Sequence, residues 1–199
     1  MQLIGMLDSP YVRRVAISLK LLELPFTHDA LSVFRNFDAF AAINPVVIAP
    51  TLVTDDGVVL MDSSLILEHI ERVAPRSLMP SGAHTQALRL IGLGLAACEK
   101  AVQIIYERNQ RPPEKQHQPW LDRIAGQLRA ACGELEGPAA KTMEWFGGEM
   151  LQPDITVAVA WRFIQTTVPE IVASADFPWL VALSARAEKL AAFRETDFQ

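Results

Sequence analysis

The spacing of hydrophobic residues changes near residue 80 of this 199-residue chain, and the two parts predict different structures. In the first part, short apolar runs alternate with helical patterns. The run Leu3–Leu7 predicts a strand, and apolar residues three or four apart between Val12 and Leu22 predict a helix after it. Phe26–Leu31 predicts a second strand, whereas Val33–Ile43 fits either a short helix or an irregular turn.

A hairpin and a further helix complete the first part. Asp55-Asp56-Gly57 separates two β-like runs, Thr51–Thr54 and Val58–Met61. An Asp-Gly pair between such runs is typical of a tight hairpin. Ser63–Val73 is amphipathic, and either Asp62 or Ser63 stands where a cap is expected. This order of elements favours a thioredoxin-like α/β domain with a mixed four-stranded sheet.

The second part has helical spacing throughout and predicts an all-α bundle. Its two long apolar stripes cover Leu88–Ile105 and Leu121–Leu135, and two more helices are expected over Asp154–Thr167 and Trp179–Leu190. We therefore expect two domains, a thioredoxin-like one over residues 1–79 and an all-helical one over residues 84–199.

Composition and charge exclude several classes of protein. The net charge is −5 with no basic cluster, so we expect neither nucleic acid nor an anionic membrane as a partner. No apolar run approaches the ~18 residues of a membrane span, and no signal-peptide pattern is visible. Cys98 and Cys132 occupy core-like positions and predict buried thiols, so a reducing, cytoplasmic location is expected. The four histidines lack metal-ligand spacing, so no metal site is expected.

The junction after the first strand carries the first candidate for chemistry. Ser9 precedes Pro10, and proline suits the first position of a helix because the N–H it lacks would have no partner there. Ser9 therefore has the character of an N-cap. Unpaired amides and the helix dipole favour negative charge at this place. The hydroxyl could cap the helix or stabilise a thiolate.

Three motifs stand in order along the chain: Ser9-Pro10-Tyr11-Val12-Arg13-Arg14-Val15, Asn44-Pro45 with Ala49-Pro50-Thr51-Leu52, and Met61-Asp62-Ser63-Ser64-Leu65-Ile66. Together they resemble the cytosolic glutathione transferases, and in particular serine-type classes such as tau, zeta and related bacterial enzymes. Their order, their spacing and the helical second half all agree, so the resemblance covers essentially the whole chain. The resemblance implies a homodimeric enzyme whose glutathione thiolate attacks a small hydrophobic electrophile.

The resemblance implies a role for each motif. Ser9 would donate a hydrogen bond to the thiolate of glutathione and so lower the pKa of its thiol. Ala49, before a cis Pro50, would offer its main chain to the cysteinyl residue. Asp62 and Ser63 would bind the ammonium and the carboxylate of the γ-glutamyl end.

Two further sets of residues are expected to contact the substrates. Val46-Val47-Ile48 is apolar where the family commonly has Lys, Arg or Gln for the glycyl carboxylate, so Arg35 or a residue of a partner subunit is expected to substitute. An electrophile pocket between the domains would draw on aromatic residues of both: Tyr11, Phe34, Tyr106 and Trp161.

Each motif also has a plainer interpretation. Ser9, Asp62 and Ser63 could be ordinary helix caps, and Pro50 could be a trans proline that begins a strand. With the same fold, the protein could be a zeta-like isomerase, a glutathione-dependent dehalogenase or peroxidase, or a non-catalytic binding or regulatory module.

Three other residues are expected to serve the fold. Of Arg13 and Arg14, we expect one to form an ion pair and the other to face solvent. Asp154 is expected to bond backbone amides at the start of a buried helix.

Overall fold

The structure is a computed structural model that describes residues 1–137 and 149–198. It divides into two compact units, of which the first comprises Met1–Leu78 together with Glu188–Gln199 and the second comprises Met79–Ala187. The C-terminal residues, which the sequence placed in the helical domain, thus group with the first unit. A helical pattern does not tell which neighbours a helix packs against, so this grouping was not visible in the sequence.

The first unit contains a four-stranded mixed sheet with the strand order β2-β1-β3-β4. β1 pairs in parallel with β2 and antiparallel with β3, and β3 pairs antiparallel with β4. This topology confirms the predicted thioredoxin-like fold. The strands are β1 (Gln2–Ile4), β2 (Thr27–Asp29), β3 (Thr51–Val53) and β4 (Val59–Leu60).

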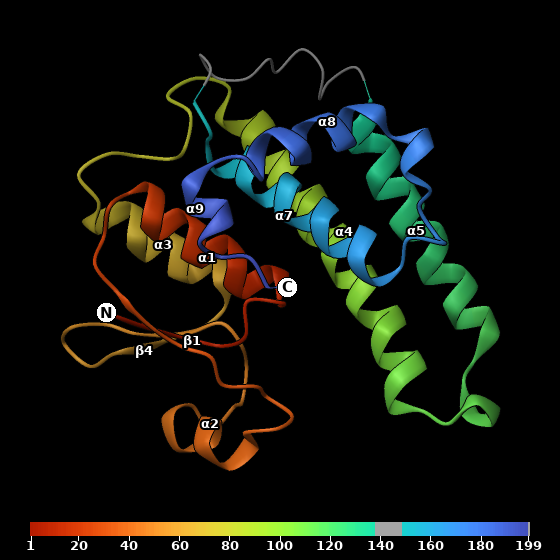
Figure 1. Cartoon of the computed structure of the whole chain (residues 1–199), viewed down its shortest axis with the longest axis horizontal. Helices are drawn as coiled ribbons and strands as arrows, with labels where there is room; N and C mark the ends of the chain where they lie inside the picture. Colours follow the sequence, from red (N-terminus) through yellow and green to blue (C-terminus); the bar gives the residue numbers. More distant parts are fainter. Residues whose placement is uncertain (138–148, 199) are drawn as a thin grey trace. The chain divides into compact units, whose positions relative to one another are not determined.

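Helices cover both faces of this sheet. α1 (Pro10–Leu21) and α3 (Ser63–Val73) pack against each other on one face, and α2 (Phe37–Ile43) lies on the opposite face (Figure 1). The short α9 (Ala191–Arg194) packs against α1. Apolar side chains from all three layers are fully buried between them, among them Leu3, Val15, Phe40, Leu52 and Ile66.

β1 ends earlier than the predicted run Leu3–Leu7, and Gly5 explains why. Gly5 has a φ of +136°, which L side chains rarely adopt. A Cβ at this position would lie 2.6 Å from Cγ2 of Val12 and 3.0 Å from Cβ of Ala49. Glycine therefore ends the strand at Ile4 and lets the turn bring the start of α1 against Ala49.

The second unit is helical in its described residues. α4 (His84–Gln110) packs against α5 (Gln118–Glu136) and α7 (Gln152–Thr167), and α8 (Pro178–Ala187) packs against both α5 and α7. Short 3₁₀ turns, Pro113–Lys115 and Ser174–Asp176, lie between these helices.

The expected helix over Trp179–Leu190 was wrong at its end. α8 stops at Ala187, and α9 begins only at Ala191 in the first unit. By contrast, Cys98 and Cys132 are buried thiols as predicted. Burial raises the pKa of the Cys132 thiol to about 12, because the thiolate would lose its solvation.

Candidate functional site

Ser9 is the N-cap of α1, as its sequence context predicts. Its backbone is extended, and its Oγ accepts a hydrogen bond from the Val12 N–H at 3.5 Å, the long limit for such a bond. The residue is partly exposed. A hydroxyl that accepts one hydrogen bond still has its own proton to donate. Ser9 can therefore cap the helix weakly and donate a hydrogen bond to an anion at the same time.

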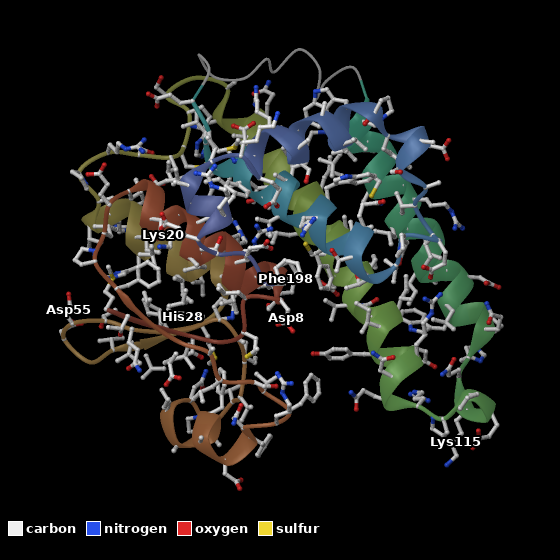
Figure 2. All side chains as sticks on the ribbon, viewed as in Figure 1. Asp8, Lys20, His28, Asp55, Lys115 and Phe198 are labelled. Carbon is white, nitrogen blue, oxygen red and sulfur yellow. The ribbon has the colours of Figure 1, made fainter. Side chains whose placement is uncertain are left out.

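The turn before Ser9 is held by β2. The Gly5 N–H donates to the Asp29 carbonyl at 3.0 Å, and Nε2 of His28 lies 2.8 Å from the Gly5 carbonyl oxygen. His28 is labelled beneath α1 in Figure 2. Further along, the Ser9 N–H donates to the Met6 carbonyl at 3.2 Å. These bonds tie the turn that leads into α1 to β2.

The second motif forms a loop that is organised by Asn44. The Asn44 amide nitrogen donates to Oγ1 of Thr51 at 2.8 Å, and its oxygen accepts from the Val46 N–H at 3.1 Å. The peptide bond between Ala49 and Pro50 is cis. Pro50 is buried and Ala49 is partly exposed. Since Ala49 also lies against Gly5, this loop adjoins the start of α1.

The third motif forms the N-terminus of α3. Oδ1 of Asp62 accepts from the Ser64 N–H at 2.6 Å, and Asp62 is exposed. Ser63 is only 2% exposed, and its Oγ accepts a hydrogen bond from Nη1 of Arg14 at 3.2 Å. The Ser63 hydroxyl therefore points into the protein, whereas the Asp62 carboxylate is accessible to a ligand.

Arg14 is the residue at this site whose contacts are not visible in the sequence. Both Arg13 and Arg14 are buried, so the expectation that one of them faces solvent is wrong. Arg13 forms the expected ion pair, with Glu188 at 2.7 Å. Arg14 instead reaches from α1 to the first turn of α3, where it contacts both Ser63 and Ser64. In the sequence, only its place directly after Arg13 marked Arg14, because the serines that it contacts lie about fifty residues further along the chain.

The N-terminus of α3 offers groups that suit opposite charges. The helix dipole and the Arg14 guanidinium together make the positive side of the site, which favours a carboxylate. The Asp62 carboxylate can accept hydrogen bonds from an ammonium group. Positive and negative groups therefore meet at the start of one helix.

The remaining candidate residues lie in both units. Arg35 is exposed, as is Phe34, while Tyr11 is partly buried. In the second unit, Tyr106 is 46% exposed, and its partial burial raises the pKa of its phenol. Trp161 is buried in α7, where its ring centroid lies 5.6 Å from that of Phe177. A shared electrophile pocket for these aromatic residues stays a prediction.

Among the described residues, 1–137 and 149–198, no group of three or more His, Cys, Asp or Glu side chains could hold a metal ion. No helix among them is long and apolar enough to cross a membrane.

A thioredoxin-like domain followed by a helical region defines the fold of the glutathione transferases, and comparisons with known proteins agree. Residues 3–78 match the profile of the glutathione S-transferase N-terminal domain. The chain is thus similar to glutathione S-transferases in sequence over residues 3–78 and in fold over nearly its whole length.

Individual relatives span most of the chain. A glutathione S-transferase from Methylobacterium radiotolerans, solved with glutathione sulfonate, is 27% identical to this chain with a TM-score of 0.88. The match covers 98% of this chain and 93% of that enzyme. A family member from Pseudomonas fluorescens Pf-5 with bound glutathione is 27% identical with a TM-score of 0.86, covering 98% and 97%. The uncharacterized GST-like protein YibF of Escherichia coli K12 is 29% identical over 141 residues, 69% of each chain.

Proposed function

We propose that this protein is a glutathione transferase that conjugates the thiolate of glutathione to small hydrophobic electrophiles. The observation that carries the proposal is the partly exposed Ser9 hydroxyl at the positive end of α1, beside the loop that contains Ala49. A hydroxyl donor and helix-terminal amides in one place favour an anion such as a thiolate.

The proposed task of Ser9 is to stabilise the thiolate rather than to remove its proton. A free thiol with a pKa near 8.5 is only about 3% ionised at pH 7. Lowering that pKa by two pH units would make about three quarters of the bound thiol reactive. The sulfur then forms a bond to the electrophilic carbon, and the leaving group departs with its electron pair.

The rest of the tripeptide is assigned to the groups around Ser9. The γ-glutamyl carboxylate would lie at the N-terminus of α3 above Arg14, and its ammonium group would contact Asp62. The main chain of Ala49 would pair with the cysteinyl residue. Arg35 is the proposed partner of the glycyl carboxylate, because Val46 and Ile48 beside that end are exposed and apolar.

The same proposal includes the contacts of the hydrophobic substrate and the oligomeric state of the protein. Tyr11, Phe34, Tyr106 and Trp161 are the proposed contacts of the electrophile. We further infer a cytoplasmic homodimer.

Calorimetry with glutathione and conjugation assays on three variants of Ser9 test the proposal. Ser9→Ala removes both the helix cap and the donor, and should lower kcat about a hundredfold. Ser9→Asp keeps a good helix cap but has no proton to donate and carries a negative charge. It should therefore retain the stability of the wild type and lose conjugation, whereas Ser9→Thr should keep both.

Three results would contradict the proposal. An active Ser9→Asp variant would show that Ser9 is only a cap. Failure of the wild type to bind millimolar glutathione would exclude every glutathione-dependent reaction. Binding without conjugation of any electrophile would favour an isomerase or a non-catalytic module.

A further inference from the structure

The C-terminal segment, which we define as Glu188–Phe198, is bound to α1 through one buried side chain. Arg13 is 1% exposed, and its Nη1 and Nη2 donate to the two carboxylate oxygens of Glu188 at 2.8 and 2.7 Å. Nη2 also donates to the Phe193 carbonyl, and Nε to the Thr196 carbonyl, both at 3.1 Å. Three separate points of the segment thus converge on one guanidinium.

Aromatic rings and a second ion pair extend this contact. The Arg13 guanidinium lies 5.3 Å from the ring centroid of Phe198 and 5.6 Å from that of Phe193, within the range of a cation–π interaction. Nζ of Lys20 lies 2.7 Å from a carboxylate oxygen of Glu195. Lys20 and Phe198 are labelled towards opposite ends of α1 in Figure 2. The segment therefore holds the helix along its length.

Arg13 also belongs to the turn that begins at Ser9. Its backbone N–H donates to the Ser9 carbonyl at 3.0 Å, which closes the first turn of α1. The first N–H groups of any helix lack helical partners. In this helix the Ser9 cap bond is 3.5 Å long and no acidic residue stands in the first turn. The first turn is thus held weakly by its own residues and strongly by the Arg13 side chain.

The geometry points to Arg13 as a positioning residue: the C-terminal segment, acting through Arg13, fixes the first turn of α1 and with it the Ser9 hydroxyl. This inference rests on the proposed role of Ser9 in binding the glutathione thiolate. A thiolate needs its donor at a defined distance and angle, since the strength of a hydrogen bond falls steeply with misalignment. Loosening the segment should therefore raise the pKa of the bound thiol.

The test is Glu188→Gln, which lies outside the proposed glutathione site and breaks the paired hydrogen bonds while keeping the size of the side chain. Glu188→Asp, which keeps the charge, serves as the rescue variant. Glu68→Gln is the matched control, because it removes the exposed Glu68–Arg72 pair in the same unit. Removal of Phe198 and Gln199 provides a second disruption of the segment if Glu188→Gln does not fold.

Two readouts separate positioning from general stability. Hydrogen exchange of the Val12 and Arg13 amides should become about tenfold faster in Glu188→Gln, with Glu188→Asp intermediate and Glu68→Gln unchanged. The ultraviolet absorbance of the bound thiolate, followed against pH, should show a higher thiol pKa in Glu188→Gln alone. At about pH 5, where the bound thiol is protonated in every variant, the Kd of glutathione should change little, because the bonds of the segment do not involve Arg14 or Asp62.

Equal exchange rates and equal thiol pKa values in Glu188→Gln and Glu68→Gln would overturn the inference. Faster exchange with an unchanged thiol pKa would also overturn it, because the segment would then stabilise α1 without positioning Ser9. Failure of the wild type to bind glutathione would instead refute the proposed function, and the exchange rates would still decide whether the segment holds the first turn.

Discussion

Two consecutive arginines of α1 bind different parts of the first unit. Successive residues of an α-helix point about 100° apart around its axis. Arg13 therefore reaches the C-terminal segment while Arg14 reaches the start of α3. Burying a charge is costly unless it is paired and hydrogen-bonded. Arg13 has the Glu188 carboxylate and two carbonyl oxygens as acceptors, and Arg14 has the hydroxyls of Ser63 and Ser64.

Arg14→Gln tests the charge at the N-terminus of α3. We expect it to raise the Kd of glutathione about tenfold, since hydrogen bonds and charges near a carboxylate contribute about 1.5–3 kcal/mol. Calorimetry with the dipeptide cysteinylglycine, which lacks the γ-glutamyl group, provides the comparison. An equal loss of affinity for both ligands would mean that Arg14 acts only through the fold.

The residues of this site differ in how far the sequence predicts them. Ser9 and Asp62 were predictable as helix caps, because a cap depends on neighbours within four residues. The buried orientation of Ser63 was not predictable, since it depends on Arg14 from another helix. The roles of these residues with glutathione stay predictions.

At the scale of elements, the loop from Asn44 to Thr51 contains an unusual conformation. Val47 has a φ of +53°, in the left-handed region that a β-branched residue rarely adopts. The Val47 N–H donates to the Asn44 carbonyl at 2.9 Å, and Asn44 also holds Val46 and Thr51. The bonds to Asn44 therefore impose a conformation that Val47 itself disfavours.

Val47→Gly should relieve this strain. The left-handed conformation costs a non-glycine residue about 1–2 kcal/mol, and glycine itself loses about 0.5–1 kcal/mol through its flexibility in the unfolded chain. We therefore expect the free energy of unfolding in urea to rise by about 0.5–1 kcal/mol. Val46→Gly, at a neighbouring exposed position without a positive φ, should lower it. Similar losses in both variants would contradict this account.

α7 begins with a buried carboxylate. Oδ2 of Asp154 accepts from the Leu151 N–H at 2.9 Å, as expected of a folding residue, but Oδ1 has no hydrogen-bond partner among the described residues. Burial raises the pKa of Asp154 from 3.8 to about 6, although the Leu151 N–H and Arg186 act in the opposite direction. The folded protein therefore binds this proton more tightly than the unfolded chain does.

The sign of the pH dependence follows from that difference. The stability from Asp154 is greatest when the group is protonated in both states, below about pH 4, and falls as the pH rises to about 6. The full loss is about 3 kcal/mol at most. Asp154→Asn should remove this slope in urea unfolding measured across the range, whereas the exposed Asp176→Asn should retain it. An unchanged slope in Asp154→Asn would refute the assignment.

The lengths of elements were predicted less well than their order. The sequence placed the hairpin and the helices α1, α3, α4, α5 and α7 correctly, because their apolar spacing is local. It extended β1 to Leu7, although Gly5 ends the strand through its contacts with Val12 and Ala49. It also joined α8 to residues that belong to another unit. Both errors depend on contacts between distant parts of the chain.

At the scale of the whole molecule, the first unit is not continuous in sequence. Met1–Leu78 contains the sheet and the three proposed contact segments for glutathione, but Glu188–Gln199 completes the unit. A buried Arg13 without Glu188 would be an uncompensated charge, which costs about 3–5 kcal/mol. A domain of this size has a total stability of only about 5–15 kcal/mol. The boundary after residue 79 that the sequence suggests therefore leaves out residues on which the unit depends.

A fragment of residues 1–78 should consequently be poorly stable alone and gain stability from a peptide of residues 188–199. We expect urea unfolding of the fragment, followed by circular dichroism, to shift to higher urea concentration as the peptide is added, since a ligand that binds only the folded state stabilises it. The same peptide with Glu188→Gln should bind more weakly, because it offers Arg13 only one carbonyl oxygen in place of a carboxylate.

Fragment 1–78 with Arg13→Met should be more stable alone than the unmodified fragment, since a buried charge has been removed, and should respond less to the peptide. A fragment 1–78 that is equally stable with and without the peptide would show that the C-terminal segment is not needed for the first unit.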